Sequence, residues 1–278
     1  MIRNNITTAL ILEDDADWDV RIKQQMRDFA LSTNALLQPL QNASNTYADR
    51  TYPHPSPKVA EANHDISFSN LPITIPPKTS PYGDNWDLLW LGHCGMTFPH
   101  FPQTPKGRII QTMDPTVPEK QHLKNMMSGN DLQESSFPHH TRLVHHASEG
   151  LCTLGYAVSQ TGARKILHEL GTRNVNSPID LLLQCWCDGQ EWFGKPANCL
   201  TTQPALFEPY RAKGKIGTDT DIAGLADSKV VREKGFTDVV RWSTRGNLGE
   251  LIDGGVNFTD QWPDTVITPY ARDLGVDR

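Results

Sequence analysis

The chain has 278 residues, of which 37% are hydrophobic and 21% charged, and its formal net charge is −6 at pH 7. This composition is typical of a folded globular protein, and the negative charge argues against a nucleic-acid partner held mainly through its phosphates. No run of residues approaches the roughly 20 consecutive apolar positions that a membrane-spanning helix needs. The five cysteines form no CxxC pair, so their spacing indicates neither a zinc ribbon nor a complete set of disulfides.

The first feature in chain order is an apolar run that ends in acids. Residues 8–12 carry no charge, and five carboxylates follow within seven positions: Glu13, Asp14, Asp15, Asp17 and Asp19. This pattern predicts a buried strand that delivers its last residues to a solvent-filled cleft. Closely packed carboxylates repel one another, and an all-oxygen cluster favours Mg²⁺, Mn²⁺ or Ca²⁺ as the balancing charge.

Two other interpretations of the acids compete with a metal site. Acidic residues are common in the first turn of a helix, where the helix dipole stabilises them, and this interpretation stays open. An EF-hand loop is excluded. Counting from Asp15 places Val20 where the loop requires Gly and Met26 where it requires a bidentate Glu.

The middle of the chain alternates regular elements with Pro-rich stretches. Apolar residues at helical spacing predict an amphipathic helix over residues 19–37 that packs on the sheet. Residues 38–85 and 96–144 are rich in Pro and are expected to be long loop insertions, the second of which folds over the cleft. Between them, residues 87–95 predict a strand that is apolar on both faces and therefore buried under helices.

The second half adds a core strand, two helices and an edge strand. Residues 151–159 predict the core strand, and residues 161–167 predict the start of the first helix. The second helix carries Asp180 in its first turn, where the carboxylate either complements the helix dipole or faces the cleft. Residues 201–207 are expected to form an edge strand that Pro204 ends.

Several basic residues offer further candidates. His145 and His146 precede the core strand and are either additional metal ligands or, as the spacing favours, surface or acceptor-side histidines. Arg241 and Arg245 either contact a diphosphate or are solvated, as exposed arginines usually are.

Four sequence motifs occur in a fixed order along the chain. They are Ile11-Leu12-Glu13-Asp14-Asp15-Ala16, Trp86-Asp87-Leu88-Leu89-Trp90-Leu91-Gly92, Gly155-Tyr156-Ala157-Val158-Ser159 followed by Gly162-Ala163, and Pro178-Ile179-Asp180. This ordered set resembles glycosyltransferase family 25, which includes bacterial lipooligosaccharide galactosyltransferases, collagen galactosyltransferases and many fungal members. The likeness runs from Ala9 to Ile222, is greatest to the fungal branch, and is far more specific than any single motif.

The resemblance implies an α/β fold of the GT-A type, in which helices flank a mixed sheet, as one glycosyltransferase domain over residues 1–278. In the family, the segment before the acidic motif contributes strand and helix units that hold the uridine and ribose of the donor. No such units precede Thr8 here. The chain therefore resembles the second part of a family member, and we expect either a partial GT-A fold that is incomplete at its amino end or a reading frame that begins too late.

The resemblance also implies a reaction, the transfer of a sugar, by likeness galactose, from a UDP-sugar to a hydroxyl of a glycan or protein with inversion. It implies that Glu13, Asp15 and Asp17 bind Mn²⁺ or Mg²⁺, with Asp15 as the direct ligand. Asp14 and Asp221 are the implied contacts to the donor, and Asp180 is the implied general base. The alternative is a non-catalytic, truncated glycosyltransferase-like domain that binds a cation or a sugar.

Overall fold

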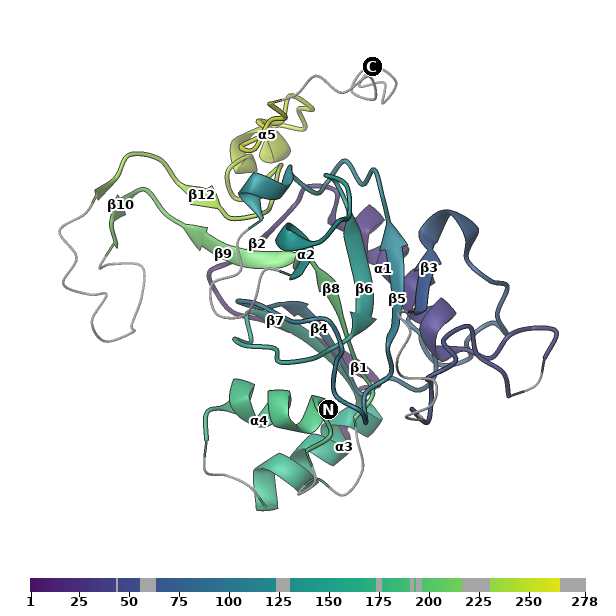
Figure 1. Ribbon diagram of the computed structural model, residues 1–278. Helices are drawn as coiled ribbons and strands as arrows, with labels where there is room; N and C mark the ends of the chain where they lie inside the picture. The colour runs from purple at the N-terminus through teal and green to yellow at the C-terminus, as the bar shows by residue number, and fades with distance from the viewer. Residues whose placement is uncertain are drawn as a thin grey trace.

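The computed structural model describes residues 1–43, 45–55, 64–123, 131–173, 177–190, 193, 197–216 and 231–265. Within these residues the central feature is a seven-stranded sheet in the order β1-β7-β4-β8-β6-β5-β3 (Figure 1). Only the β4–β8 and β3–β5 pairs are parallel, so the sheet is mixed and the predicted α/β class is confirmed. The strands are β1 (Thr8–Leu12), β3 (His64–Ser67), β4 (Leu88–Gly92), β5 (Gly107–Gln111), β6 (Arg142–His146), β7 (Gly155–Ser159) and β8 (Cys199–Gln203).

Helices cover both faces of this sheet around β4, which is buried along its whole length as its apolar sequence predicts. Leu89 and Leu91 pack in a cluster with α1 on one face, whereas Leu88 and Trp90 pack in a cluster with α3 and α4 on the other (Figure 1). The helices are α1 (Ile22–Leu37), α2 (Asp131–Glu134), α3 (Gln160–His168), α4 (Ile179–Cys187) and α5 (Leu248–Ile252), with 3₁₀ turns η1 (Ile2–Asn4), η2 (Phe68–Asn70) and η3 (Lys120–His122) and a π-helical turn η4 (Glu169–Arg173).

The strand β1 is not buried, so that prediction is wrong. It forms one edge of the sheet, paired with β7, and the side chains of Leu10, Ile11 and Leu12 are 50%, 37% and 37% exposed. Among the described strands, none pairs with its outer edge. Apolar composition alone does not distinguish a central strand from an uncovered edge strand.

The start of α3 shows why glycine occupies position 162. Ser159 caps the helix by accepting the Gly162 N–H at 2.9 Å. A Cβ added at Gly162 would lie 2.1 Å from the backbone oxygen of Asp87, so a side chain there would force α3 away from the sheet. The Asp87 carboxylate in turn accepts a hydrogen bond from Lys165 of α3 at 2.6 Å. The second and third motifs therefore pack directly on one another.

The two Pro-rich stretches are not loops throughout. Residues 38–85 contain β3, and residues 96–144 contain β5 together with the start of β6. Asp49 fastens the first stretch to the sheet by accepting the backbone N–H groups of Thr51 at 2.8 Å and Gly107 at 3.0 Å. The expectation of two loop insertions is corrected accordingly. Strands this short leave little periodic signal among the surrounding prolines.

The C-terminal part of the chain adds two smaller sheets. The prediction of an edge strand over residues 201–207 is wrong, because β8 is fully buried between β4 and β6. Pro204 follows β8 and so removes no hydrogen bond between the strands. A three-stranded sheet has the order β12-β9-β2, and β10 pairs with β11. Their bounds are β2 (Ala16–Trp18), β9 (Phe207–Arg211), β10 (Gly214–Lys215), β11 (Val231–Arg232) and β12 (Phe236–Thr237). Among the described residues, no helix has the length and apolarity needed to cross a membrane.

Candidate functional site

The acidic stretch begins where three strands of the large sheet meet. Because β7 runs antiparallel to both β1 and β4, its amino end lies between their carboxyl ends (Figure 1). Glu13 follows β1 directly, and its backbone N–H donates to the carbonyl of Leu154 at 2.9 Å, just before β7. The acids therefore follow a strand end, as the sequence predicts.

The five acids divide into two groups with opposite environments. Glu13 and Asp14 are exposed and Asp15 is half-buried, and we call these three residues the exposed acidic turn. Asp17 and Asp19 are 0% and 1% exposed, and we call them the buried acidic pair. The sequence motif runs through both groups, but only the first is open to a ligand.

Asp17 anchors the C-terminal part of the chain to β2. Its Oδ2 accepts hydrogen bonds from the hydroxyls of Thr237 and Ser243, and its Oδ1 accepts the backbone N–H of Arg245 at 3.0 Å. A fully buried carboxylate satisfied in this way acts as a structural hydrogen-bond acceptor. We therefore leave Asp17 out of the candidate metal site.

Asp19 is held in a similar way. Its carboxylate pairs with Arg21, with 3.0 Å between Nε and Oδ1, and its Oδ2 also accepts the backbone N–H of Trp242 at 3.3 Å. The Arg21 guanidinium lies 3.6 Å from the centroid of the Trp242 ring. Both members of the buried acidic pair thus join the first strands to the C-terminal segment.

Arg245 reaches the acidic segment through the backbone rather than through carboxylates. Its Nε donates to the carbonyl of Ala16 at 3.1 Å, and an Nη donates to the carbonyl of Asp14. Its guanidinium lies 6.0 Å from the ring of Tyr210, whose backbone N–H donates to the carbonyl of Asp15 at 2.9 Å. Within the described residues, no Lys or Arg forms an ion pair with the three side chains of the exposed acidic turn. Their charge is left for solvent or a bound cation to balance.

Asp180 lies beside the same strand end. It occupies the first turn of α4, where its Oδ2 accepts the backbone N–H of Cys152 at 3.3 Å and its Oδ1 that of Leu181 at 2.9 Å. Thr153, which follows Cys152 in the chain, donates its hydroxyl to the Glu13 carboxylate at 3.1 Å. Two consecutive residues thus connect Asp180 to Glu13, and the structure brings these two sequence candidates together.

Cys152 is the fixed point of this arrangement. A disulfide joins Cys152 to Cys94, which lies shortly after β4. The Cys152 carbonyl accepts the indole N–H of Trp90 at 2.8 Å. Its φ of 63° lies in the left-handed region, which a non-glycine residue adopts only where its surroundings hold it there. The backbone N–H that Asp180 accepts is therefore tied to the core of the sheet.

A second disulfide joins Cys187, the last residue of α4, to Cys199, the first of β8, while Cys185 is free and half-buried. The cysteine spacing did not predict these two disulfides. The spacing does not indicate the pairs because neighbouring elements of the fold bring each pair together. Disulfide formation depends on the distance between the two Cα atoms rather than on their separation along the chain.

The chemistry of the exposed acidic turn fits a hard divalent cation, although its ligand set is incomplete. Among the described residues, no three His, Cys, Asp or Glu side chains come together as a metal-binding group. Mg²⁺ is often held by one or two carboxylates while substrate phosphates and water supply the other ligands. The exposed acidic turn offers carboxylates for at most such a partial ligand set.

His145 and His146 lie in the interior rather than at the surface, which corrects the expectation. Both belong to β6, and they are 0% and 3% exposed. Burial lowers the pKa of His145 to about 3 and that of His146 to about 4, so both rings are neutral at pH 7. Neither belongs to a metal-binding group within the part of the chain that the structure describes.

The remaining candidates have mixed outcomes. Arg241 forms ion pairs with Asp260 and Asp264, so its charge is already balanced within the C-terminal segment. Asp221 lies outside the described residues. Tyr156 is half-buried in β7, and its pKa is raised by burial and by the negative charge of Glu13, which places the phenol near the exposed acidic turn.

Sequence reasoning missed Thr153, Tyr210 and Ser243, which hold the acidic segment in place. None of them belongs to a periodic pattern or a motif. The only available signal was the position of Thr153, two residues before the third motif.

Comparisons with protein-family models, with curated proteins and with solved structures found no match to this chain. The family resemblance therefore rests on the four motifs. In the structure these motifs lie at β1 and the turn after it, at β4, at β7 with the start of α3, and at the start of α4.

Proposed function

We propose that the protein is a metal-dependent glycosyltransferase with a GT-A-like fold, related to family 25, that moves a sugar from a UDP-sugar to a hydroxyl acceptor. By the resemblance, the sugar is galactose. The observation that carries the proposal is the meeting of the exposed acidic turn and Asp180 at Cys152 and Thr153. Such a reaction needs carboxylates for a cation at the diphosphate and a separate carboxylate for the acceptor.

The exposed acidic turn is assigned to the donor. Asp15 would be the direct ligand of Mn²⁺ or Mg²⁺, Glu13 would support it, and Asp14 would contact the donor. When bound, the cation stabilises the negative charge that develops on the departing diphosphate. Thr153 orients the Glu13 carboxylate, and Arg245 fixes the backbone of the turn, so the acids are held in place while staying open to solvent.

Asp180 is assigned to the acceptor as general base. Its carboxylate takes the proton of the acceptor hydroxyl while the hydroxyl oxygen bonds to the anomeric carbon. The bond between that carbon and the phosphate oxygen breaks, and UDP leaves with the bonding electrons. Attack on the face opposite the leaving group inverts the anomeric configuration. The N–H groups of Cys152 and Leu181 keep the Asp180 carboxylate in one orientation.

Incubation of the chain with UDP-galactose, Mn²⁺ and a panel of hydroxyl acceptors tests the proposal. We expect UDP release that requires both the metal and an acceptor. An absence of UDP release with every sugar nucleotide, together with no UDP binding by calorimetry, would contradict it.

One observation favours a second candidate, a non-catalytic domain that binds a cation or a sugar. Among the described strands none pairs with the outer edge of β1, and Leu10, Ile11 and Leu12 are exposed beside the exposed acidic turn, where sugar transfer needs a site shielded from water. This candidate predicts cation or sugar binding without UDP release, so the same assay separates the two.

A further inference from the structure

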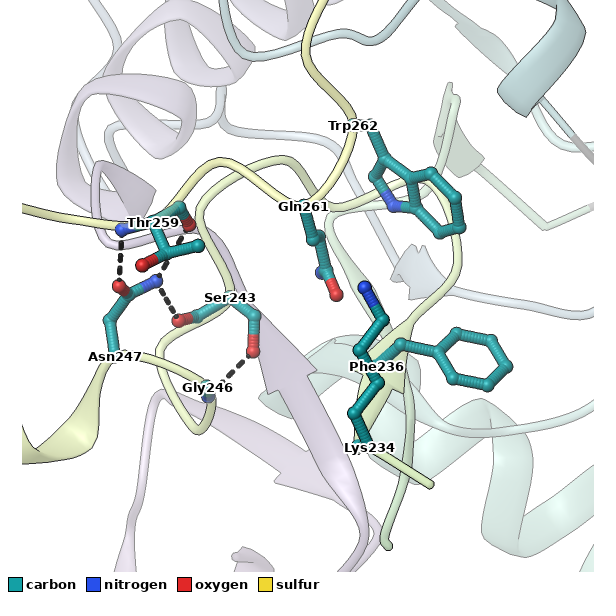
Figure 2. A pocket seen from close by; sticks show the side chains of 9 residues that line it. Lys234, Phe236, Ser243, Gly246, Asn247, Thr259, Gln261 and Trp262 are labelled. Atoms are coloured by element: carbon teal, nitrogen blue, oxygen red, sulfur yellow. Dashed lines mark hydrogen bonds between the residues drawn. The ribbon is translucent and has the colours of Figure 1, made fainter. Parts of the chain in front are cut away.

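A pocket of about 350 Å³ lies beside the acidic segment and has no role in the reaction described above. We call it the β12 pocket because Phe236 of β12 forms part of it, together with the turn before α5 and residues 259–262 (Figure 2). Pockets of this size are large enough to bury a small ligand.

One wall of the β12 pocket is polar and already hydrogen-bonded. The Asn247 amide nitrogen donates to the carbonyls of Ser243 at 2.8 Å and Thr259 at 3.1 Å, and its oxygen accepts the Thr259 N–H at 2.6 Å (Figure 2). The Gln261 amide is bound to two backbone groups in the same way. Because these side chains are fixed before a ligand arrives, binding costs little further conformational entropy.

The other wall is aromatic. Phe236 and Trp262 meet edge to face, with ring centroids 6.4 Å apart and an interplanar angle of 86°. The indole N–H of Trp262 donates to the carbonyl of Thr237 at 3.0 Å, and the ring packs on His122. Both rings are half-buried and keep part of their surface open (Figure 2). A pyranose ring presents a face of C–H groups that packs well on such aromatic surfaces.

Two polar groups of the pocket remain open to a ligand. Within the described residues, the Lys234 ammonium and the Thr259 hydroxyl have no hydrogen bond or ion pair. The Lys234 side chain is exposed, and it lines the pocket together with Gln261 (Figure 2). Sugar hydroxyls can bind both groups, because a hydroxyl accepts a hydrogen bond from the Lys234 ammonium and either donates to or accepts from the Thr259 hydroxyl.

Two residues that line the β12 pocket connect it to the acidic segment. Ser243 lines the pocket and donates its hydroxyl to Asp17. Gly235 packs on the hydroxyl of Tyr210, where an added Cβ would lie 2.2 Å from that oxygen, and the Tyr210 backbone N–H binds the carbonyl of Asp15. Among the residues that line the pocket, the charged side chain is that of Lys234, which can donate hydrogen bonds to neutral sugar hydroxyls.

We propose that the β12 pocket binds one pyranose ring of a carbohydrate. Its fixed polar wall, its two aromatic rings and the open Lys234 ammonium and Thr259 hydroxyl together fit a polyhydroxylated ring. The further assignment, that this ring belongs to a glycan acceptor, rests on the proposed function, whereas carbohydrate binding itself does not.

Ligand-observed NMR titrations with the methyl glycosides of galactose, glucose and mannose test the proposal. We expect saturable binding of at least one glycoside with a dissociation constant of about 1 mM, which is weak as befits a single ring. Saturation transfer should be strongest at the ring C–H protons that face the aromatic wall.

Three variants and a matched control locate the binding. Trp262→Leu should weaken binding at least fivefold, Trp262→Phe should largely retain it, and Lys234→Gln should weaken it two- to threefold. Lys234 is exposed, so its variant keeps the test valid if Trp262→Leu fails to fold. Lys23→Gln makes the same charge change at an exposed residue of α1 that lines a different groove, and it should leave binding unchanged.

The absence of saturable binding of all three glycosides up to about 50 mM would overturn the proposal, as would binding that Trp262→Leu and Lys234→Gln both leave unchanged. Binding of UMP that Lys234→Gln weakens, with no glycoside binding, would assign the pocket to a nucleotide instead. Glycoside binding without UDP release would support the carbohydrate pocket and contradict the proposed function. Metal-dependent UDP release without glycoside binding would support the proposed function and contradict the carbohydrate pocket.

Discussion

Asp15 and Asp17 are separated by one residue, yet one carboxylate is partly open to solvent while the other is enclosed by Thr237, Ser243 and the backbone of Arg245. The difference arises where β2 begins, because Asp17 lies within the three-stranded sheet and Asp15 lies in the turn before it. The exposed acidic turn is therefore available for a ligand, whereas the buried acidic pair holds the fold together. Two acids of one motif, only one residue apart, therefore have different roles.

The largest expected effect separates catalysis from folding at Asp180. Asp180→Asn should lower the transfer rate by roughly 10²–10⁴, the usual contribution of a general base. The free energy of unfolding should fall by only about 1 kcal/mol, because the Asn amide oxygen still accepts one of the two backbone N–H groups. The half-buried site then loses one hydrogen bond and the interaction with the helix dipole. Transfer rate, UDP affinity and melting temperature measured on one preparation check this. A large drop in melting temperature would make Asp180 a structural residue.

The next effect tests whether Cys152 holds the exposed site together. Replacing Cys94 and Cys152 by Ser opens a disulfide between residues 58 positions apart, which should cost about 4 kcal/mol of stability and also weaken UDP binding in the presence of Mn²⁺. The control replaces Cys187 and Cys199, which should cost about 3 kcal/mol and leave UDP binding unchanged. Equal loss of UDP affinity in both variants would contradict a specific role for Cys152.

The same substitution on either side of Ala16 sharpens the comparison directly. Asp17→Ala removes the acceptor of three hydrogen bonds and should lower the free energy of unfolding by about 3 kcal/mol. Asp15→Ala keeps the backbone hydrogen bond to Tyr210 and should change it by less than about 0.5 kcal/mol. Urea denaturation of both variants measures this difference. Equal destabilisation would mean that the two groups of acids are not distinct.

A smaller effect is the loss of stability at acid pH that comes from the buried side chain of His93. Burial lowers the pKa of His93 from 6.5 to about 4, so below pH 6.5 the unfolded chain binds more protons than the folded chain and stability falls until about pH 4. Asp188, whose pKa burial raises to about 6, works in the opposite direction. His93→Gln should reduce the stability lost between pH 7 and pH 5 by about 2 kcal/mol. Thermal unfolding at both pH values checks this, and an unchanged loss would show that His93 is not responsible.

The sequence predicts the elements with a strong periodic or apolar signal. The helix over 19–37 and the strand over 87–95 are present as α1 and β4, because each buries a continuous face that its composition reveals. The sequence does not predict the exposure of β1, the central position of β8, or the short strands β3 and β5. Whether a strand lies at the edge or the centre depends on residues far away along the chain.

For the candidate site, the sequence predicts residue types at strand and helix ends but not their environments. It places Glu13 after a strand and Asp180 in the first turn of a helix, and both positions are as expected. It does not separate Asp17 from Asp15, since burial of Asp17 depends on Thr237 and Ser243, more than 200 residues away. The link through Cys152 and Thr153 likewise depends on how β7 lies beside β1.

The most direct test of the account is UDP binding measured by calorimetry with and without Mn²⁺, for the unaltered protein and for Asp15→Asn. If the exposed acidic turn holds a cation that a diphosphate completes, UDP should bind at least about tenfold more tightly with Mn²⁺, a gain of about 1.4 kcal/mol. Asp15→Asn should remove that gain without lowering the melting temperature. UDP affinity that is independent of Mn²⁺, or a gain that survives Asp15→Asn, would contradict the account.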